Sequence, residues 1–197
     1  MTIATTSHPT LVDALWRADG GILRPVALAV LGSLALWVSA KVQIPFYPVP
    51  MTMQTFAVLV IGMTFGWRLG AATVLLYLAE GALGLPVFAG TPERGIGLAY
   101  MAGPTGGFLA GFVVAAALVG MLAHRGWDRR LSTTLVAMVL GTAVIFACGI
   151  LWLGTLIGWD KPVLDLALIP FLPAAAFKIA LAAAVLPAVW KLTTTPR

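Results

Sequence analysis

Most of this chain consists of apolar runs without a charged residue, separated by short segments that carry nearly all of its charge. Only 10% of the 197 residues are charged, 60% are hydrophobic, and the mean hydropathy is +1.00. A water-soluble domain carries about 25% charged residues, because it must cover its outside with polar groups. This chain has too few charges to do so, and the sequence therefore predicts an integral membrane protein whose outer surface meets the lipid bilayer.

The charge-poor runs fit six membrane-spanning helices, since one helix crosses the bilayer core with about 20 apolar residues. The Pro-rich stretch 43–50 cannot be regular helix, because each proline lacks a donor and restricts the residue before it. We therefore expect an all-α integral membrane protein in which residues 1–22 are a cytoplasmic segment, 23–192 the membrane domain and 193–197 a cytoplasmic tail. The six helices are expected over residues 25–40, 53–65, 69–85, 104–123, 131–157 and 171–191.

The distribution of Lys and Arg predicts the orientation of these helices. With the N-terminus inside, the inner segments hold eight basic residues and the outer loops hold three, which is the bias expected of cytoplasmic loops. Both termini are therefore predicted to be cytoplasmic. The inner residues are Arg17, Arg24, Arg68, Arg125, Arg129, Arg130, Lys191 and Arg197, and the outer ones are Lys41, Arg94 and Lys161.

Two ionisable residues, Glu80 and Lys178, interrupt the apolar helices. A charge at membrane depth costs at least about 2.5–3.5 kcal/mol, so it is expected to face protein, water or a ligand. From their distances along the chain to Leu85 and Phe171, they lie roughly 8 Å and roughly 10 Å below the outer face. Arg94 follows in the outer loop. The three charges predict a pocket open to the outside; alternatively, Glu80 and Lys178 form a structural ion pair, or Lys178 only extends its amine toward the interface.

Gln54 and Tyr100 are weaker candidates for the same pocket, since each can donate or accept a hydrogen bond. Catalytic and metal-binding constellations are not expected. The single Cys148 excludes an intrachain disulfide, and His8 and His124 lie outside the expected helices. The segment 103–107 lacks the lysine of a phosphate-binding loop, so ATP-driven work would need another subunit. The scattered net charge of +5 does not indicate nucleic-acid binding.

Four segments, in order along the chain, resemble the BioY family, the biotin-specific S components of energy-coupling factor (ECF) transporters. They are Gln43-Ile-Pro-Phe-Tyr-Pro-Val-Pro-Met-Thr-Met-Gln-Thr55, Tyr77-Leu-Ala-Glu-Gly-Ala-Leu-Gly-Leu-Pro-Val-Phe-Ala-Gly90, Gly103-Pro-Thr-Gly-Gly-Phe108, and Phe171-Leu-Pro173 with Lys178. The resemblance covers the chain from about Leu23 to Leu192.

This resemblance implies a six-helix S-component bundle in the bacterial cytoplasmic (inner) membrane that captures biotin from outside under the Pro-rich loop. It also implies a transmembrane coupling subunit and ATPase subunits as partners, no cofactor, and leaves a homo-oligomer open. The family's ligand contacts map onto Glu80, Arg94 and Lys178. The biotin carboxylate would pair with Lys178 or Arg94, and its ureido N–H groups would donate to an acceptor such as Glu80.

One departure from the family concerns the start of the last helix. Members of the family commonly have an acidic residue three positions before the lysine, whereas this chain has Ala174 and Ala175 there. Either Glu80 takes the acidic role or the ligand contacts differ. The alternative functions are an S component for another vitamin and a membrane scaffold without a ligand of its own. An intramembrane enzyme is disfavoured, because no nucleophile–base pair is visible.

Overall fold

The computed structural model describes residues 8–16, 21–44, 47–90 and 96–194. In this part of the chain, five helical segments are long and apolar enough to cross a membrane. They are α2 (Leu23–Lys41), α3 (Gln54–Ala82), α5 (Gly106–Ala123), α6 (Leu131–Ile157) and the segment Val163–Thr193, which contains α7 (Val163–Ala167), a 3₁₀ turn (Ile169–Phe171) and most of α8 (Leu172–Thr194).

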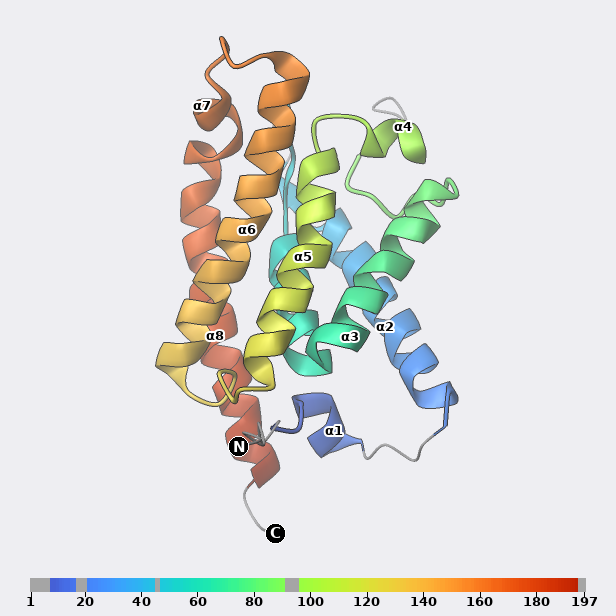
Figure 1. Cartoon of the computed structure of the whole chain (residues 1–197), viewed down its shortest axis with the longest axis vertical. Coiled ribbons are helices and arrows are strands. Elements are labelled where there is room, and N and C mark those ends of the chain that lie inside the picture. The colour runs from blue at the N-terminus through green and yellow to red at the C-terminus, as the bar shows by residue number, and fades with distance from the viewer. Residues whose placement is uncertain (1–7, 17–20, 45–46, 91–95, 195–197) are drawn as a thin grey trace, which may run out of the picture.

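Helix α3 consists of two arms that fold back on each other at Gly66 (Figure 1). Gly66 has φ 79° and ψ 174°, a left-handed conformation that glycine adopts without strain. A Cβ on Gly70 would lie 3.0 Å from the Cα of Gly62, whereas eight residues of continuous helix rise about 12 Å. The break that the sequence predicted between the helices 53–65 and 69–85 is therefore present, and the arms cover residues 54–65 and 67–82.

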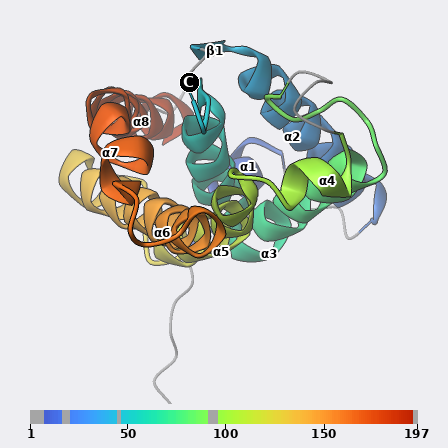
Figure 2. The same ribbon diagram turned by 90° about the horizontal axis from the view of Figure 1, so that it is seen from above.

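The long helices form an arc in which α2 packs chiefly on α3, α3 on α5, α5 on α6, and α6 on α8 (Figure 2). The contact between α3 and α5 is close, because a Cβ on Gly62 would lie 2.6 Å from the main-chain oxygen of Ala116. Seen from above, a short strand pair lies at the opening of the arc between α2 and α8. This pair, β1 (Gln43–Ile44) and β2 (Met51–Thr52), is antiparallel and aligns Gln43 with Thr52.

The short elements differ from the sequence-based expectation. The strand pair, α1 (Leu11–Leu15), α4 (Leu98–Met101) and α7 were all expected as loop, and each is too short to show a periodic pattern. Pro104 was expected to open a helix, but it lies in the turn before α5, which begins at Gly106. Helix α8 continues to Thr194, so the expected tail 193–197 begins within helix.

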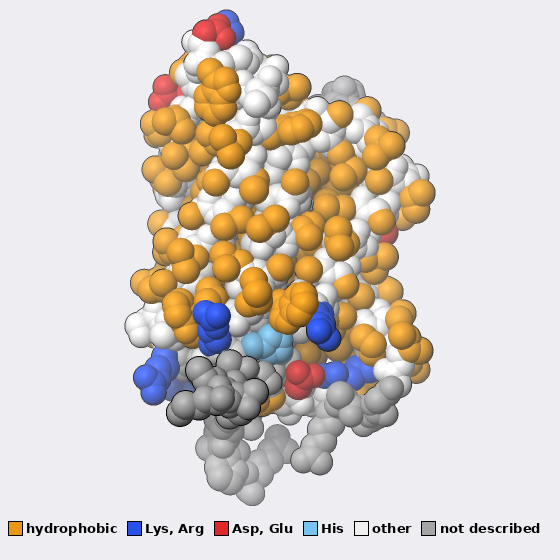
Figure 3. Space-filling model, in the orientation of Figure 1, with side chains coloured by type: hydrophobic (Ala, Val, Ile, Leu, Met, Phe, Trp, Pro, Cys, Tyr) orange, Lys and Arg blue, Asp and Glu red, His pale blue; other side chains and the backbone are white. Residues whose placement is uncertain are grey.

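Both described chain ends lie at the same end of the bundle, which we call the terminal end (Figure 1). There the main-chain N–H of His8 donates to the oxygen of His124 (2.9 Å), and Trp190 of α8 donates to the Asp128 carboxylate (2.6 Å). The Arg129 guanidinium lies 4.5 Å from the centre of the Trp190 ring. Lys and Arg side chains gather at this end on the face shown in Figure 3, and apolar side chains cover the middle.

Two carboxyl groups at the terminal end have shifted pKa values. Burial raises the pKa of Asp128 above its usual value, against the lowering effect of the hydrogen bond from Trp190. Burial by itself would also raise the pKa of Asp13, but hydrogen bonds from Thr10 and Arg24, together with the charge of Arg24, bring it below its ordinary value. The Arg24–Asp13 ion pair is 2.8 Å long and joins α2 to the segment before it.

Candidate ligand-binding site

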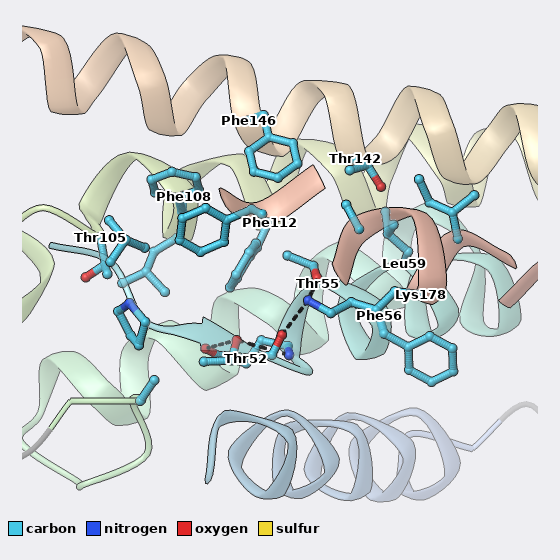
Figure 4. A pocket seen from close by; sticks show the side chains of 18 of the residues that line it. Thr52, Thr55, Phe56, Leu59, Thr105, Phe108, Phe112, Thr142, Phe146 and Lys178 are labelled. Carbon is cyan, nitrogen blue, oxygen red and sulfur yellow. Dashed lines mark hydrogen bonds between the residues drawn. The ribbon is translucent and has the colours of Figure 1, made fainter. Parts of the chain in front are cut away.

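A cavity lies between the strand pair, the first arm of α3, α5, α6 and α8 (Figure 4). It is in the half of the bundle away from the terminal end, since Tyr100 of α4 and Thr105, directly before α5, both line it. Most of its wall is apolar, and a few polar side chains converge on it, as is typical of small-molecule sites. The apolar wall includes Leu59, Phe108, Phe112, Met138, Phe146 and Phe171.

Lys178 is the one charged residue among the described residues that line this cavity. Its ammonium nitrogen donates to the main-chain oxygen of Thr52 (2.6 Å) and to the hydroxyl of Thr55 (3.1 Å), as Figure 4 shows. A lysine ammonium has three N–H donors. Because these two protein acceptors are neutral, the positive charge stays available for an anionic ligand.

Gln54, at the start of α3, is 4% exposed and lines the cavity beside Lys178. Its amide nitrogen donates to the hydroxyl of Tyr77 (2.6 Å), and that hydroxyl donates to the main-chain oxygen of Val87 (2.9 Å). Among the described residues, the amide oxygen of Gln54 accepts a single, long hydrogen bond, from the Thr52 hydroxyl (3.4 Å). This oxygen therefore retains acceptor capacity for a ligand N–H group.

Tyr100 lines the cavity from α4, as the sequence predicted for a pocket residue. Its ring stacks on Phe88, with centroids 5.0 Å apart and an angle of 15° between the planes. Phe88 in turn meets Tyr77 edge-on at 5.5 Å. These ring contacts connect the segment after α3 to the wall of the cavity.

Glu80 lies elsewhere, between α2 and α3. Its carboxylate accepts a hydrogen bond from the hydroxyl of Ser33 on α2, and it is not among the described residues that line the cavity. Among the described residues, ion pairs join Arg24 to Asp13 and Lys161 to Asp160, so the alternative of a Glu80–Lys178 pair is not observed. Arg94 falls outside the described residues, and its predicted role stays a prediction.

The structure also shows what occupies the positions where the family commonly has an acidic residue. Ala175 is buried and lines the cavity one turn before Lys178. The cavity is therefore apolar at this point, and Thr52 and Thr55 supply the acceptors for the lysine. Sequence reasoning missed both threonines. It also missed Phe108 and Phe112, although their spacing of four places them on one face of a helix.

Comparisons with known proteins show the family of this chain. The family model described as "BioY family" matches residues 8–195. A biotin transporter BioY of Rhizobium etli is 36% identical over 157 residues, covering 76% of this chain and 82% of that protein. A biotin transporter BioY of Thermotoga maritima is 31% identical over 161 residues, covering 82% of this chain and 92% of that protein.

A solved structure shares the fold. The crystal structure of the S-component for biotin from an ECF-type ABC transporter superposes with a TM-score of 0.70 at 20% identity, covering 88% of this chain and 94% of that chain. This likeness concerns the fold, while the family model and the relatives concern the sequence. Since the family model spans nearly the whole chain and the relatives exceed 30% identity over three quarters of it, the chain belongs to the BioY family.

Proposed function

We propose that this chain is the substrate-binding S component of an ECF-type transporter and that it takes up biotin across the bacterial cytoplasmic membrane. The observation that carries the proposal is the ammonium of Lys178 in an otherwise apolar cavity, because biotin combines a carboxylate with an apolar chain and ring system. The relatives are named biotin transporters, which supports transport rather than enzymatic catalysis.

For the bound state, we propose that the carboxylate of biotin binds Lys178 and that one ureido N–H donates to the amide oxygen of Gln54. The fused rings would contact the phenylalanine wall, with Tyr100 closing the outer side. Arg94 remains a proposed second partner for the carboxylate. The proposed contribution of Glu80 is indirect, through its hydrogen bond with Ser33 and the position of α2.

We further propose six membrane crossings with both termini in the cytoplasm. The two arms of α3 support separate crossings, since they lie side by side. The terminal end would face the cytoplasm, which agrees with the basic residues gathered there and with the positive-inside rule. The cavity then lies in the outer half of the membrane. Partner subunits, namely a transmembrane coupling protein and ATPases, would supply the energy for release inside.

Titration of the detergent-solubilised protein with radiolabelled biotin tests the proposal. Saturable binding that excess unlabelled biotin displaces is the expected result. Saturable binding of thiamin or riboflavin in place of biotin would instead make the chain an S component for another vitamin. If none of the three vitamins binds, the scaffold alternative replaces the proposed function.

A further inference from the structure

A second cavity lies directly beside the binding cavity, between the strand pair and α8. It is the more open of the two cavities. Its rim carries exposed apolar side chains: Val42 is 56% exposed, Ile44 67% and Phe177 64%. Ala174 and Met53 line it more deeply. The function proposed above does not use this cavity.

The wall between the two cavities is thin. Thr52 and Lys178 line both of them, one from the strand pair and one from α8. The α8 residues near Lys178 line different cavities. Ala174 and Phe177 line the second cavity, whereas Ala175 and Ile179 line the binding cavity. The hydrogen bond from Lys178 to the Thr52 oxygen (2.6 Å) therefore runs across the boundary.

In the described part of the chain, hydrogen bonds and a ring stack hold the outer side of the binding cavity. The Tyr77 hydroxyl donates to the oxygen of Val87, and the Lys41 ammonium donates to the oxygen of Phe88 (2.8 Å). Phe88 also stacks on Tyr100. A substrate that entered on this side would have to separate these contacts first.

On the side of the second cavity the contacts can be exchanged. A carboxylate that arrives there meets the ammonium of Lys178, which can leave the neutral Thr52 oxygen for a charged acceptor. Such an exchange replaces one hydrogen bond by a stronger one, and a lysine side chain moves by rotation about single bonds without any change in the backbone. The apolar rim suits the apolar part of the same molecule.

We propose that the second cavity is the entrance to the binding cavity and that Lys178 is its gate. An anionic substrate with an apolar body enters between α8 and the strand pair, and its carboxylate takes the Lys178 ammonium from Thr52 as the molecule passes inward. This inference rests on the proposed function, because it takes biotin as the substrate. It assigns Lys178 a role in access in addition to its role in the bound state.

The test is to narrow the entrance without touching the binding cavity. Ala174→Trp places an indole in the second cavity, and Ala176→Trp is the matched control, since Ala176 is exposed on the same helix and lines neither cavity. Association and dissociation rates of radiolabelled biotin are measured on the purified proteins. In A174W both rates should fall by about tenfold while Kd stays within about twofold, because an entrance changes the barrier and leaves the bound state alone. A176W should bind at the wild-type rates.

A second form of the experiment does not depend on how the tryptophan variant folds. In a Cys148→Ala background, Ala174→Cys gives a single thiol, which is modified with a bulky maleimide after purification. The same preparation is measured before and after modification, and Ala176→Cys serves as the control. Unchanged rates after complete modification of Cys at 174 would overturn the proposal, as would a weaker Kd with an unchanged association rate. Wild-type protein that binds no biotin at all would instead overturn the proposed function.

Discussion

The ammonium nitrogen of Lys178 lies 2.6 Å from the main-chain oxygen of Thr52, so the last helix of the chain is joined to the strand pair that precedes α3. These residues are 126 positions apart. The bond holds the cation at the edge of an apolar cavity with a neutral partner, and a carboxylate would be a better one. The proposed binding of biotin depends on this preference of the ammonium for a carboxylate over a neutral oxygen.

Replacing Lys178 removes the one charge found among the described lining residues. Lys178→Ala should weaken biotin binding by roughly tenfold or more, or about 1.4 kcal/mol. Equilibrium titration with radiolabelled biotin measures the effect. Lys161→Ala is the control, because Lys161 is exposed in the loop before α7 and should bind as wild type does. Equal affinities of the two variants would show that Lys178 is not the anion site.

Tyr77→Phe removes the hydroxyl that accepts a hydrogen bond from the amide of Gln54 and donates one to the main-chain oxygen of Val87. It leaves the amide of Gln54 and the oxygen of Val87 without their buried partner, which costs about 1–3 kcal/mol. The midpoint of thermal unfolding in detergent should therefore fall. Tyr47→Phe is the matched change at a side chain that is 78% exposed, and its midpoint should not move. A similar midpoint for both variants would contradict the assigned role of Tyr77.

Glu80 and Ser33 should be coupled in stability. Each single change, Ser33→Ala or Glu80→Ala, removes the same hydrogen bond between α2 and α3, so the double mutant should lose less than the sum of the two. The expected coupling is about 1–3 kcal/mol in thermal unfolding. Biotin affinity should change less than in Lys178→Ala. If Glu80→Ala weakens binding as strongly, Glu80 contacts the ligand, as the sequence first indicated.

Asp128 should make stability depend on pH in an unusual direction. Because burial raises its folded-state pKa, the folded protein holds the proton more tightly than the unfolded chain. Its contribution is complete below the unfolded pKa and is lost as the pH rises through the folded pKa. The unfolding midpoint of the wild type relative to Asp128→Asn should therefore rise on acidification from about pH 7 to about pH 4.

Asp13 should make stability depend on pH in the opposite direction to Asp128. Its folded-state pKa is lowered, so its contribution is present above the unfolded pKa and is lost as the pH falls through the folded one. The unfolding midpoint of the wild type relative to Asp13→Asn should therefore fall on acidification. The midpoint difference between the wild type and each Asn variant is compared across this pH range. If both differences change in the same direction, one of the two carboxyl environments has been assigned wrongly.

Close packing between α3 and α5 should make Gly62 intolerant of a side chain. In Gly62→Ala the new methyl group would lie 2.6 Å from the Ala116 oxygen, and relief requires a shift of backbone. The expected loss of stability is about 1–3 kcal/mol. Gly21→Ala is the control, since no heavy atom lies within 4 Å of a Cβ there. A Gly62→Ala protein that unfolds at the wild-type midpoint would exclude this contact.

The long helices could be predicted from the sequence because a bilayer demands uninterrupted apolar runs, and the gap expected between the helices 53–65 and 69–85 contains the turn at Gly66. The strand pair and α4 could not. They are held by contacts with distant segments, such as the ring stack between Tyr100 and Phe88, and these contacts leave no local pattern.

For the site, the cost of burying a charge identified Lys178, and Gln54 and Tyr100 proved to line the same cavity. Glu80 shows the limit of this reasoning. Counting residues from a helix end gives the depth of a side chain, but the direction in which it points depends on how the helices are arranged around it. The second arm of α3 directs Glu80 toward α2.

The pairing of Ser33 with Glu80 also bears on how the chain enters the membrane during synthesis. Helix α2 leaves the ribosome before α3 and has no charged residue between Arg24 and Lys41, so it can be inserted into the bilayer as a single helix. When the second arm of α3 follows with its carboxyl group, the hydroxyl that meets it is already in place. The order of these residues along the chain thus provides a partner for the acidic side chain as soon as it is inserted.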